Sequence, residues 1–186
     1  AKKSRRMSVP DTQPVEAAFH YCPSCGEARD GGGNPLTCVC AFRYFFNPAG
    51  AVGTLVSDAS GRVLFIRRER DPGKSKLGMP GGFIDAGESG EEAARREAYE
   101  EVGLTLGELS YLTSHPNTYA YDGVVYQVTD FFYTAKVECF EGIESDASEV
   151  QDWFIAQPED VRKEDFAFES NAFAVDTYVR KRVNAE

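Results

Sequence analysis

Hydrophobic and polar positions along this chain follow two periods, one typical of strands and one typical of helices. Segments rich in Val, Phe and Tyr with a period near two predict strands at 51–57, 63–67, 104–114, 124–137 and 150–154. The first two strands are separated by a turn-forming sequence at 58–61 and should form a hairpin. The helical period predicts helices at about 90–102 and 169–183, and Pro158 should open a short helical turn.

The helix predicted at about 90–102 has start and stop signals of its own. Ser89 is a favourable N-cap residue, and Glu92 stands at the position that completes a capping box. Gly103, directly after the last periodic residue, can adopt the left-handed conformation that ends a helix. These signals agree with the hydrophobic period, so the bounds of this helix are the firmest of the predicted set.

The same helix gathers carboxylates on one face. At about 100° per residue, Glu97, Glu100 and Glu101 share an arc of roughly 100°. Like charges at this spacing repel one another, and a hard divalent cation would relieve the repulsion. A solvated acidic face is the alternative interpretation. The glycines at 81 and 82 favour the metal, because glycine lets the backbone approach a ligand and a solvated helix needs no such loop.

These residues resemble the motif of a known family. The pattern Gly-x5-Glu-x7-Arg-Glu-U-x-Glu-Glu-x-Gly-U, in which U is apolar, is the Nudix box. The chain matches every specified position, with Gly82, Glu88, Arg96, Glu97, Ala98, Glu100, Glu101, Gly103 and Leu104. The resemblance implies an α/β fold, an α/β/α sandwich with a mixed sheet. It also implies hydrolysis of a nucleoside diphosphate linked to another group.

The resemblance assigns roles to individual residues. The ligands of Mg²⁺ or Mn²⁺ would be a backbone carbonyl of the glycine loop, assigned to Gly82, and the side chains of Glu97, Glu100 and Glu101. Arg96 would form a bidentate bond to Glu88 and fix the loop against the helix. The general base would be either Glu100 or Glu149, which directly precedes the last predicted strand.

Two close cysteine pairs lie near the N-terminus, formed by Cys22, Cys25, Cys38 and Cys40. The first pair reads Cys-Pro-Ser-Cys-Gly, which is typical of a zinc knuckle, and the second has one residue fewer between its cysteines than usual. Structural Zn²⁺ is favoured, with free or oxidised thiols as the alternative. Four thiolates leave zinc no open position, so the site would be structural and not catalytic. Cys139 stands alone in a strand pattern and should be a buried thiol.

A four-cysteine ribbon ahead of a Nudix domain resembles the arrangement in NADH pyrophosphatases. In that subgroup a motif SQPWPFPxS follows the box. The corresponding stretch here keeps Ser114 and Pro116 but lacks the Trp-Pro-Phe-Pro core, so a preference for NADH is not implied. The predicted organisation is a disordered tail at 1–17, a zinc ribbon at 18–47 and a Nudix hydrolase domain at 48–186.

Composition and charge narrow the class of partner. The 186 residues are 42% hydrophobic and 27% charged, which is typical of a globular protein. The chain has no apolar run of about 18 residues and no apolar segment after its basic start, so we expect no membrane span and no signal peptide, and a cytoplasmic location. A net charge of −10 disfavours non-specific nucleic-acid binding. The expected partner is therefore a small-molecule nucleotide derivative, and a homodimer is common among similar proteins.

Four further residues are candidates for substrate binding. Arg67 and Arg68, upstream of the glycine loop, could reach phosphates, although a solvated strand end explains them as well. Tyr119 and Tyr126 could stack on an adenine, or they are ordinary half-buried strand residues.

The sequence thus predicts an Mg²⁺-dependent pyrophosphohydrolase acting on ADP-ribose, NADH or a similar nucleotide derivative. The alternative is a non-catalytic nucleotide-derivative sensor or partner-binding module built on the same domain. The intact box argues against the alternative, because a sensor has no need of every metal carboxylate.

Overall fold

The computed structural model describes residues 12–29 and 32–184, and these form two compact units. The first unit lies within Ala1–Pro48 and also contains Thr118–Gln127. The second unit combines Ala49–Asn117 with the part of the chain from Val128 onward. Each unit is described by itself below.

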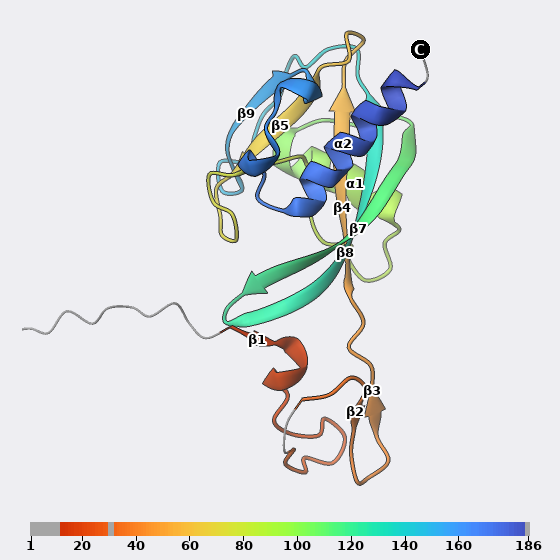
Figure 1. Ribbon diagram of the computed structural model, residues 1–186, viewed down its shortest axis with the longest axis vertical. Coiled ribbons are helices and arrows are strands. Elements are labelled where there is room, and N and C mark those ends of the chain that lie inside the picture. The colour runs from red at the N-terminus through yellow and green to blue at the C-terminus, as the bar shows by residue number, and fades with distance from the viewer. Residues whose placement is uncertain (1–11, 30–31, 185–186) are drawn as a thin grey trace, which may run out of the picture. The chain divides into compact units, whose positions relative to one another are not determined.

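The second unit is built on a mixed sheet (Figure 1). Its central strand β4 (Ala49–Ser57) runs parallel to β8 (Val124–Lys136) along its whole length, from Ala49 opposite Val128 to Ser57 opposite Lys136. The turn after β4 leads into β5 (Val63–Arg68), which pairs antiparallel with β9 (Val150–Ala156) and with the short β6 (Leu77–Gly78). The predicted hairpin is confirmed, but β4 and β5 pair only at Ser57 and Val63.

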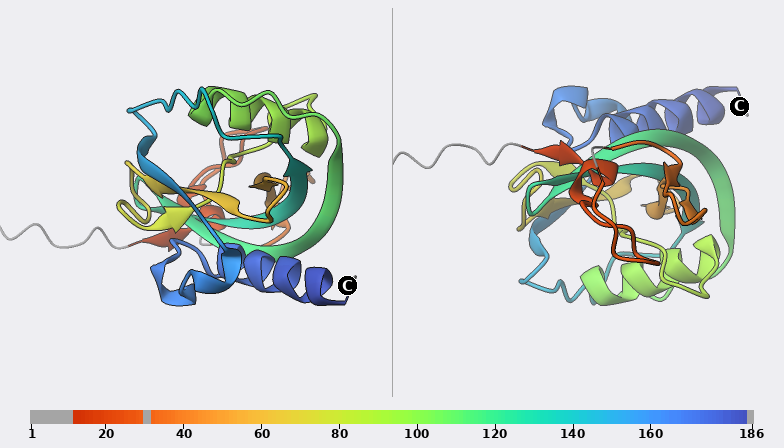
Figure 2. Two further views of the ribbon diagram at one scale, coloured as in Figure 1. Left: turned by 90° about the horizontal axis from the view of Figure 1, so that it is seen from above. Right: turned by 90° about the horizontal axis from the view of Figure 1, so that it is seen from below.

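Two helices cover opposite faces of this sheet (Figure 2). Helix α1 (Gly90–Val102) packs Ala98 and Val102 on one face, together with Val56, Leu64 and Ile66 of the sheet. Helix α2 (Glu169–Val183) packs Ala172, Ala174 and Val175 on the other face, together with Leu55, Phe65 and Phe132. The predicted α/β/α sandwich is confirmed, because each helix turns its small and branched residues to the sheet.

The ends of α1 follow from its capping residues. The Ser89 hydroxyl accepts a hydrogen bond from the Glu92 backbone N–H, and the Glu92 carboxylate accepts one from the Ser89 N–H. Gly103 has a φ of 70° and closes the helix in the left-handed conformation. The predicted capping box and C-terminal glycine are confirmed.

Other predicted elements are present, and the largest change of bounds is in one strand. The helix at 169–183, the strand from 150 and the turn at Pro158–Asp160 lie where the sequence placed them. The strand predicted at 104–114 is β7 (Leu109–Tyr121), so its first five residues were wrong. Leu104 and Leu106 belong to a loop, and both are buried in the cluster under α1. Their spacing of two gives the same apolar alternation as a strand.

Two residues of the second unit are exposed. Phe173 of α2 is 37% exposed, whereas Val175, Tyr178 and Val179 of the same helix pack in the cluster on the sheet. Cys139 was expected to be a buried strand residue, but it lies beyond the end of β8 and is exposed. The short helical turn η3 (Lys163–Asp165) completes the unit ahead of α2.

The first unit has little regular structure. Within the predicted tail, residues 1–11 lie outside the described part, and β1 (Gln13–Pro14) pairs in parallel with Val124 and Val125. A 3-10 helix, η1 (Val15–Ala18), follows, and β2 (Leu36–Thr37) pairs antiparallel with β3 (Arg43–Tyr44). The rings of Phe19, Tyr44 and Phe46 pack on one another. In the described residues of both units, no helix is long and apolar enough to cross a membrane.

Candidate functional site

The glycine loop is held against β4 by backbone hydrogen bonds. Thr54 N–H donates to the Pro80 carbonyl at 2.9 Å, and Val52 N–H donates to the Gly82 carbonyl at 2.8 Å. A Cβ on Gly81 would overlap the Val52 carbonyl oxygen and lie 2.8 Å from the Gly53 Cα. Residue 81 must therefore be glycine, because only a residue without a side chain allows this close approach.

Glu101 lies at the buried end of the carboxylate face. Its side chain is 5% exposed, and its Oε2 accepts a hydrogen bond from the Gly81 N–H at 2.9 Å. Burial raises the pKa of this carboxyl to about 8, and the negative charges of Glu97 and Glu149 act in the same direction. The charged form of Glu101 therefore lacks full compensation from the surrounding protein.

Arg96 connects the other carboxylates of the box. Its Nε and Nη2 donate to the two carboxylate oxygens of Glu88, each at 2.9 Å, which confirms the predicted bidentate bond. Its Nη1 donates to Glu97 Oε1 at 2.7 Å and to Glu100 Oε2 at 3.1 Å. Its Nη2 also donates to the Phe83 carbonyl at 3.0 Å, so one guanidinium ties the loop to the helix and spaces three carboxylates.

The three predicted metal carboxylates differ in exposure. Glu97 is largely buried, and burial raises the pKa of its carboxyl despite the opposing charge of Arg96. A Cβ on Gly82 would collide with the Glu97 carboxylate, so the loop and this side chain are in direct contact. Glu100 is 58% exposed and faces solvent. The helix therefore presents carboxylates from a buried position to an open one.

Glu149 approaches the same site from a distant loop. Its charge acts on the carboxyls of both Glu97 and Glu101. The loop is anchored on the helix, since Asp146 N–H donates to the Glu101 carbonyl at 3.0 Å. The Glu149 carboxylate accepts a hydrogen bond from Arg70 at 3.1 Å. The structure thus brings Glu149, predicted from its position before the last strand, into the electrostatic surroundings of the box.

The two candidate arginines contact different aromatic side chains. The guanidinium of Arg68 donates to the Pro72 carbonyl and lies 5.2 Å from the ring centroid of Phe168, and its charge acts on Glu101. Arg67 lies over Phe154, which packs in the cluster beneath α2. Arg68 therefore adjoins the box and Arg67 does not. Tyr119 and Tyr126 belong to the first unit.

Phe168 was not among the residues selected from the sequence. It precedes α2 and stands 100 positions after Arg68, in a segment with no motif. The backbone places it there, because Ala167 N–H donates to the Leu77 carbonyl and carries this segment along the edge of β6. No spacing rule along the sequence could have indicated the contact.

The donor set of the box fits a hard divalent cation. The oxygens of Glu97, Glu100 and Glu101 are the kind of ligand that Mg²⁺ and Mn²⁺ prefer. Burial disfavours the charged form of Glu101. The Gly81 N–H and the charge of Arg68 offset this effect only in part, so a cation is called for.

The four cysteines of the first unit form a second candidate metal centre. Their sulfur atoms all lie within 4.8 Å of one another, with Cys22 and Cys40 3.8 Å apart and Cys25 and Cys38 3.6 Å apart. Gly26 has a φ of 76°, and its N–H donates to the Cys22 carbonyl, which closes the first turn. Ala41 N–H closes the second turn on Cys38. The shortened second pair therefore still converges, and the cluster can hold a metal.

Comparison with known protein families and structures gives a consistent result. The model of the NUDIX domain family matches residues 47–175. The chain is 40% identical over 63 residues to an ADP-ribose pyrophosphatase of Methanocaldococcus jannaschii, which is 34% of this chain and 37% of that protein. It is 39% identical over 66 residues to the NAD-capped RNA hydrolase NudC of Mycobacterium bovis, 36% of this chain and 21% of that protein. The match thus spans 37% of the first of these curated relatives and 21% of the second.

Solved structures share the fold at low identity. The NUDIX domain of Shewanella oneidensis NrtR, solved with ADP ribose, has a TM-score of 0.61 and 22% identity, covering 75% of this chain and 90% of that one. A NUDIX hydrolase of Nitrosomonas europaea has a TM-score of 0.60 and 19% identity, covering 89% of this chain and 93% of that one. These likenesses show the fold alone.

Proposed function

The chain belongs to the NUDIX domain family, and from this premise we propose that it hydrolyses the pyrophosphate bond of a nucleoside diphosphate derivative with Mg²⁺ or Mn²⁺. The observation that carries the proposal is the set of connected carboxylates around Arg96, with Glu101 buried at one end. Its products would be a nucleoside monophosphate and a phosphorylated second fragment.

The residues of the box have named tasks in this proposal. Glu97, Glu100, Glu101 and the Gly82 carbonyl hold the cation, which when bound neutralises phosphate charge and raises the acidity of water. Arg96 and Glu88 position the loop and two of these carboxylates, through the bidentate bond and the bond to Glu97. Arg68 and Arg67 are the proposed phosphate contacts, and Arg68 is the better supported because it adjoins Glu101.

The general base is Glu100 or Glu149. Glu100 is the more exposed of the two side chains and is bonded to Arg96, whereas Glu149 is bonded to Arg70. Glu100→Gln and Glu149→Gln separate the two assignments, because only loss of the base removes the acid limb of the pH–rate profile. If both variants kept the acid limb of the wild type, neither residue would be the base.

Mg²⁺-dependent release of phosphate, coupled to a phosphatase, tests the proposed reaction on the full chain. The substrates are ADP-ribose, NADH, a nucleoside triphosphate and 5′-triphosphorylated or NAD-capped RNA, since the relatives' names include RNA hydrolases. Glu100→Gln and Glu101→Gln should each lower kcat by several orders of magnitude, and Glu91→Gln, on the same helix but outside the site, should not. Near-wild-type turnover of both site variants would contradict the assignment.

A ligand sensor is the second candidate, because the NrtR NUDIX domain was solved with ADP ribose. It predicts saturable binding of ADP-ribose without hydrolysis of any substrate in the panel. Hydrolysis of one substrate, abolished in Glu101→Gln, would exclude a purely sensory role.

The cysteine cluster is proposed to bind structural Zn²⁺. Hydrogen bonds from the backbone of Cys25 and Ser24 outweigh burial and lower the pKa of the Cys22 thiol to about 7, which favours the thiolate that zinc requires. Metal analysis of the purified chain should give about one Zn²⁺ per chain, and Cys38→Ser should lower it; equal zinc in both proteins would contradict the assignment.

A further inference from the structure

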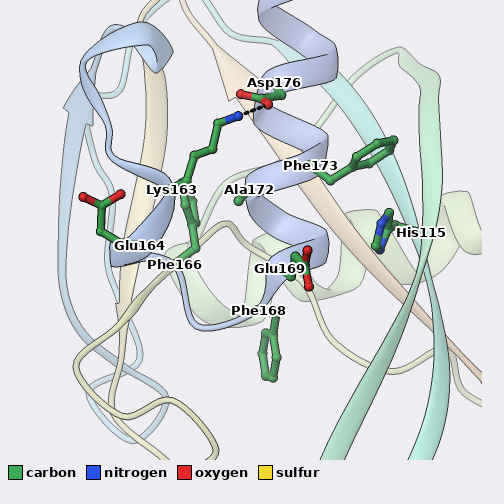
Figure 3. A pocket seen from close by; sticks show the side chains of 9 residues that line it. All are labelled: His115, Lys163, Glu164, Phe166, Phe168, Glu169, Ala172, Phe173 and Asp176. Atoms are coloured by element: carbon green, nitrogen blue, oxygen red, sulfur yellow. Dashed lines mark hydrogen bonds and ion pairs between the residues drawn. The ribbon is translucent and has the colours of Figure 1, made fainter.

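A cavity of about 530 Å³ lies between β7 and the start of α2 (Figure 3). The rings of Phe166, Phe168, Phe173 and His115 line it. None of these four residues has a task in the proposed reaction. The volume is that of sites that take a ligand of nucleoside size.

Two of these rings form an open aromatic wall. The centroids of His115 and Phe173 lie 4.5 Å apart with an interplanar angle of 42°. Phe173 is on α2, and 37% of it is exposed. Such an exposed ring on a cavity wall offers a face on which a flat ligand can stack.

The polar groups of the cavity are mainly acceptors. His115 Nδ1 lies 2.7 Å from the Pro116 carbonyl, which can only accept, so in the neutral ring Nδ1 carries the proton and Nε2 is an acceptor. The carboxylate of Glu169 also lines the cavity, while the ammonium of Lys163 is paired with Asp176. A ligand that matches these groups carries N–H donors.

A buried hydrogen-bond network joins the two walls. The carboxylate of Asp130 accepts from Ser170 Oγ at 2.6 Å and from Asn117 Nδ2 at 2.9 Å. Asn117 is on β7 two residues after His115, and Ser170 follows Glu169 in the first turn of α2. Since Asp130 and Ser170 are both buried, the network holds the strand and the helix at a fixed separation, so the cavity exists before a ligand enters.

The cavity adjoins the box at one end. Phe168 lines the cavity, and the guanidinium of Arg68 lies over its ring. The backbone N–H of Arg68 donates to the Lys76 carbonyl, directly before β6, and β6 leads into the glycine loop. A ligand with a ring in the cavity can therefore direct a phosphate group toward Arg68 and the carboxylates.

We infer that this cavity binds a flat aromatic ring bearing N–H donors, a nucleobase or a carboxamide-substituted ring, as the part of the substrate that does not react. The inference rests on the proposed function, because it names the group that accompanies the diphosphate. A ring without N–H donors would leave the acceptors of Glu169 and His115 unpaired.

Calorimetric titration with ligands that the enzyme does not cleave tests this inference. The probes are AMP, GMP and nicotinamide mononucleotide, and ribose 5-phosphate is the probe without a ring, all with Mg²⁺ and the full chain. Phe173→Ala should weaken binding of the ring-bearing probes by about five- to 150-fold, the range of base–aromatic stacking, and leave ribose 5-phosphate unchanged. Glu169→Gln should weaken the same probes. The tightest of the three identifies the ring.

Two matched variants serve as controls. Tyr111→Ala removes an exposed ring from β7 that contacts Tyr133 instead, and Glu159→Gln removes an exposed carboxylate from the turn η2 (Pro158–Asp160). Neither should change any affinity. Wild-type affinity of Phe173→Ala for all three nucleotides, or an equal loss for ribose 5-phosphate, would overturn the ring assignment, and wild-type affinity of Glu169→Gln would overturn the N–H donor assignment. Failure of hydrolysis would refute the proposed function and leave these binding results standing.

Discussion

Gly82→Ala would place one methyl group against the carboxylate of Glu97. The added Cβ would lie closest to Oε1 and 2.6 Å from Cδ, whereas ordinary contact begins at 3.4 Å, so one side must move by about 1 Å. Neither side moves freely. Arg96 holds Glu97 at 2.7 Å, and the Val52 N–H holds the Gly82 carbonyl at 2.8 Å.

The expected effect is on catalysis more than on stability. A displacement of about 1 Å at a reacting centre can cost about 10²-fold in rate, so kcat/KM for the best substrate of the panel should fall about a hundredfold. The steric cost of about 1–3 kcal/mol is partly offset by the entropy that alanine removes from the unfolded chain, so the free energy of unfolding should fall by no more than about 2 kcal/mol.

Coupled phosphate release and urea unfolding measure the two effects on the same preparation. Gly107→Ala is the matched control, because a Cβ at that position meets no atom within 4 Å. If Gly82→Ala kept kcat/KM within about twofold of the wild type, the contact between the loop and Glu97 would not govern the position of the carboxylate, and the reasoning would fail.

Three further predictions concern separate parts of the molecule. Arg96→Lys should weaken Mg²⁺ activation by about 10- to 100-fold, because lysine cannot bond both oxygens of Glu88, while Arg95→Lys should not; equal activation curves would refute this. A hydrogen bond from Ser60, with the charge of Arg62, holds the pKa of Asp58 at about 2, so the stability it contributes is complete above about pH 4 and is lost as the pH falls toward 2. Asp58→Asn should flatten that acid limb of the urea midpoints, and an unchanged limb would count against the assignment. Removal of zinc by a chelator should raise hydrogen exchange at 18–47 and leave α1 unchanged, and equal protection with and without chelator would argue against a structural metal.

The box could be predicted from sequence because its contacts are local. Glu88, Arg96, Glu97 and Glu100 lie within thirteen consecutive positions, and the helix puts the last two carboxylates within reach of the Arg96 guanidinium. The caps of α1 are equally local, since Ser89, Glu92 and Gly103 act on neighbouring backbone groups. Local hydrogen bonding and side-chain period therefore determine both the helix and most of its carboxylate face.

Contacts between distant segments could not be predicted in this way. The same alternation of apolar residues made Leu104 and Leu106 resemble a strand, and only their packing under α1 distinguishes a buried loop from a strand. Arg67 and Arg68 are adjacent in sequence, yet Arg67 lies over Phe154 and Arg68 over Phe168, and the sequence does not say which of the two lies near the box.

The sequence by itself determined the family, the fold class, the bounds of α1 and the chemistry of the two candidate metal centres. The tertiary structure decided the depth of Glu101, the approach of Glu149 and the cavity between β7 and α2. Burial and cavities depend on how the sheet and helices enclose space, and the groups that meet there are far apart in the chain, as Asn117, Asp130 and Ser170 are. No periodicity relates such residues, so their proximity follows only from the packed fold.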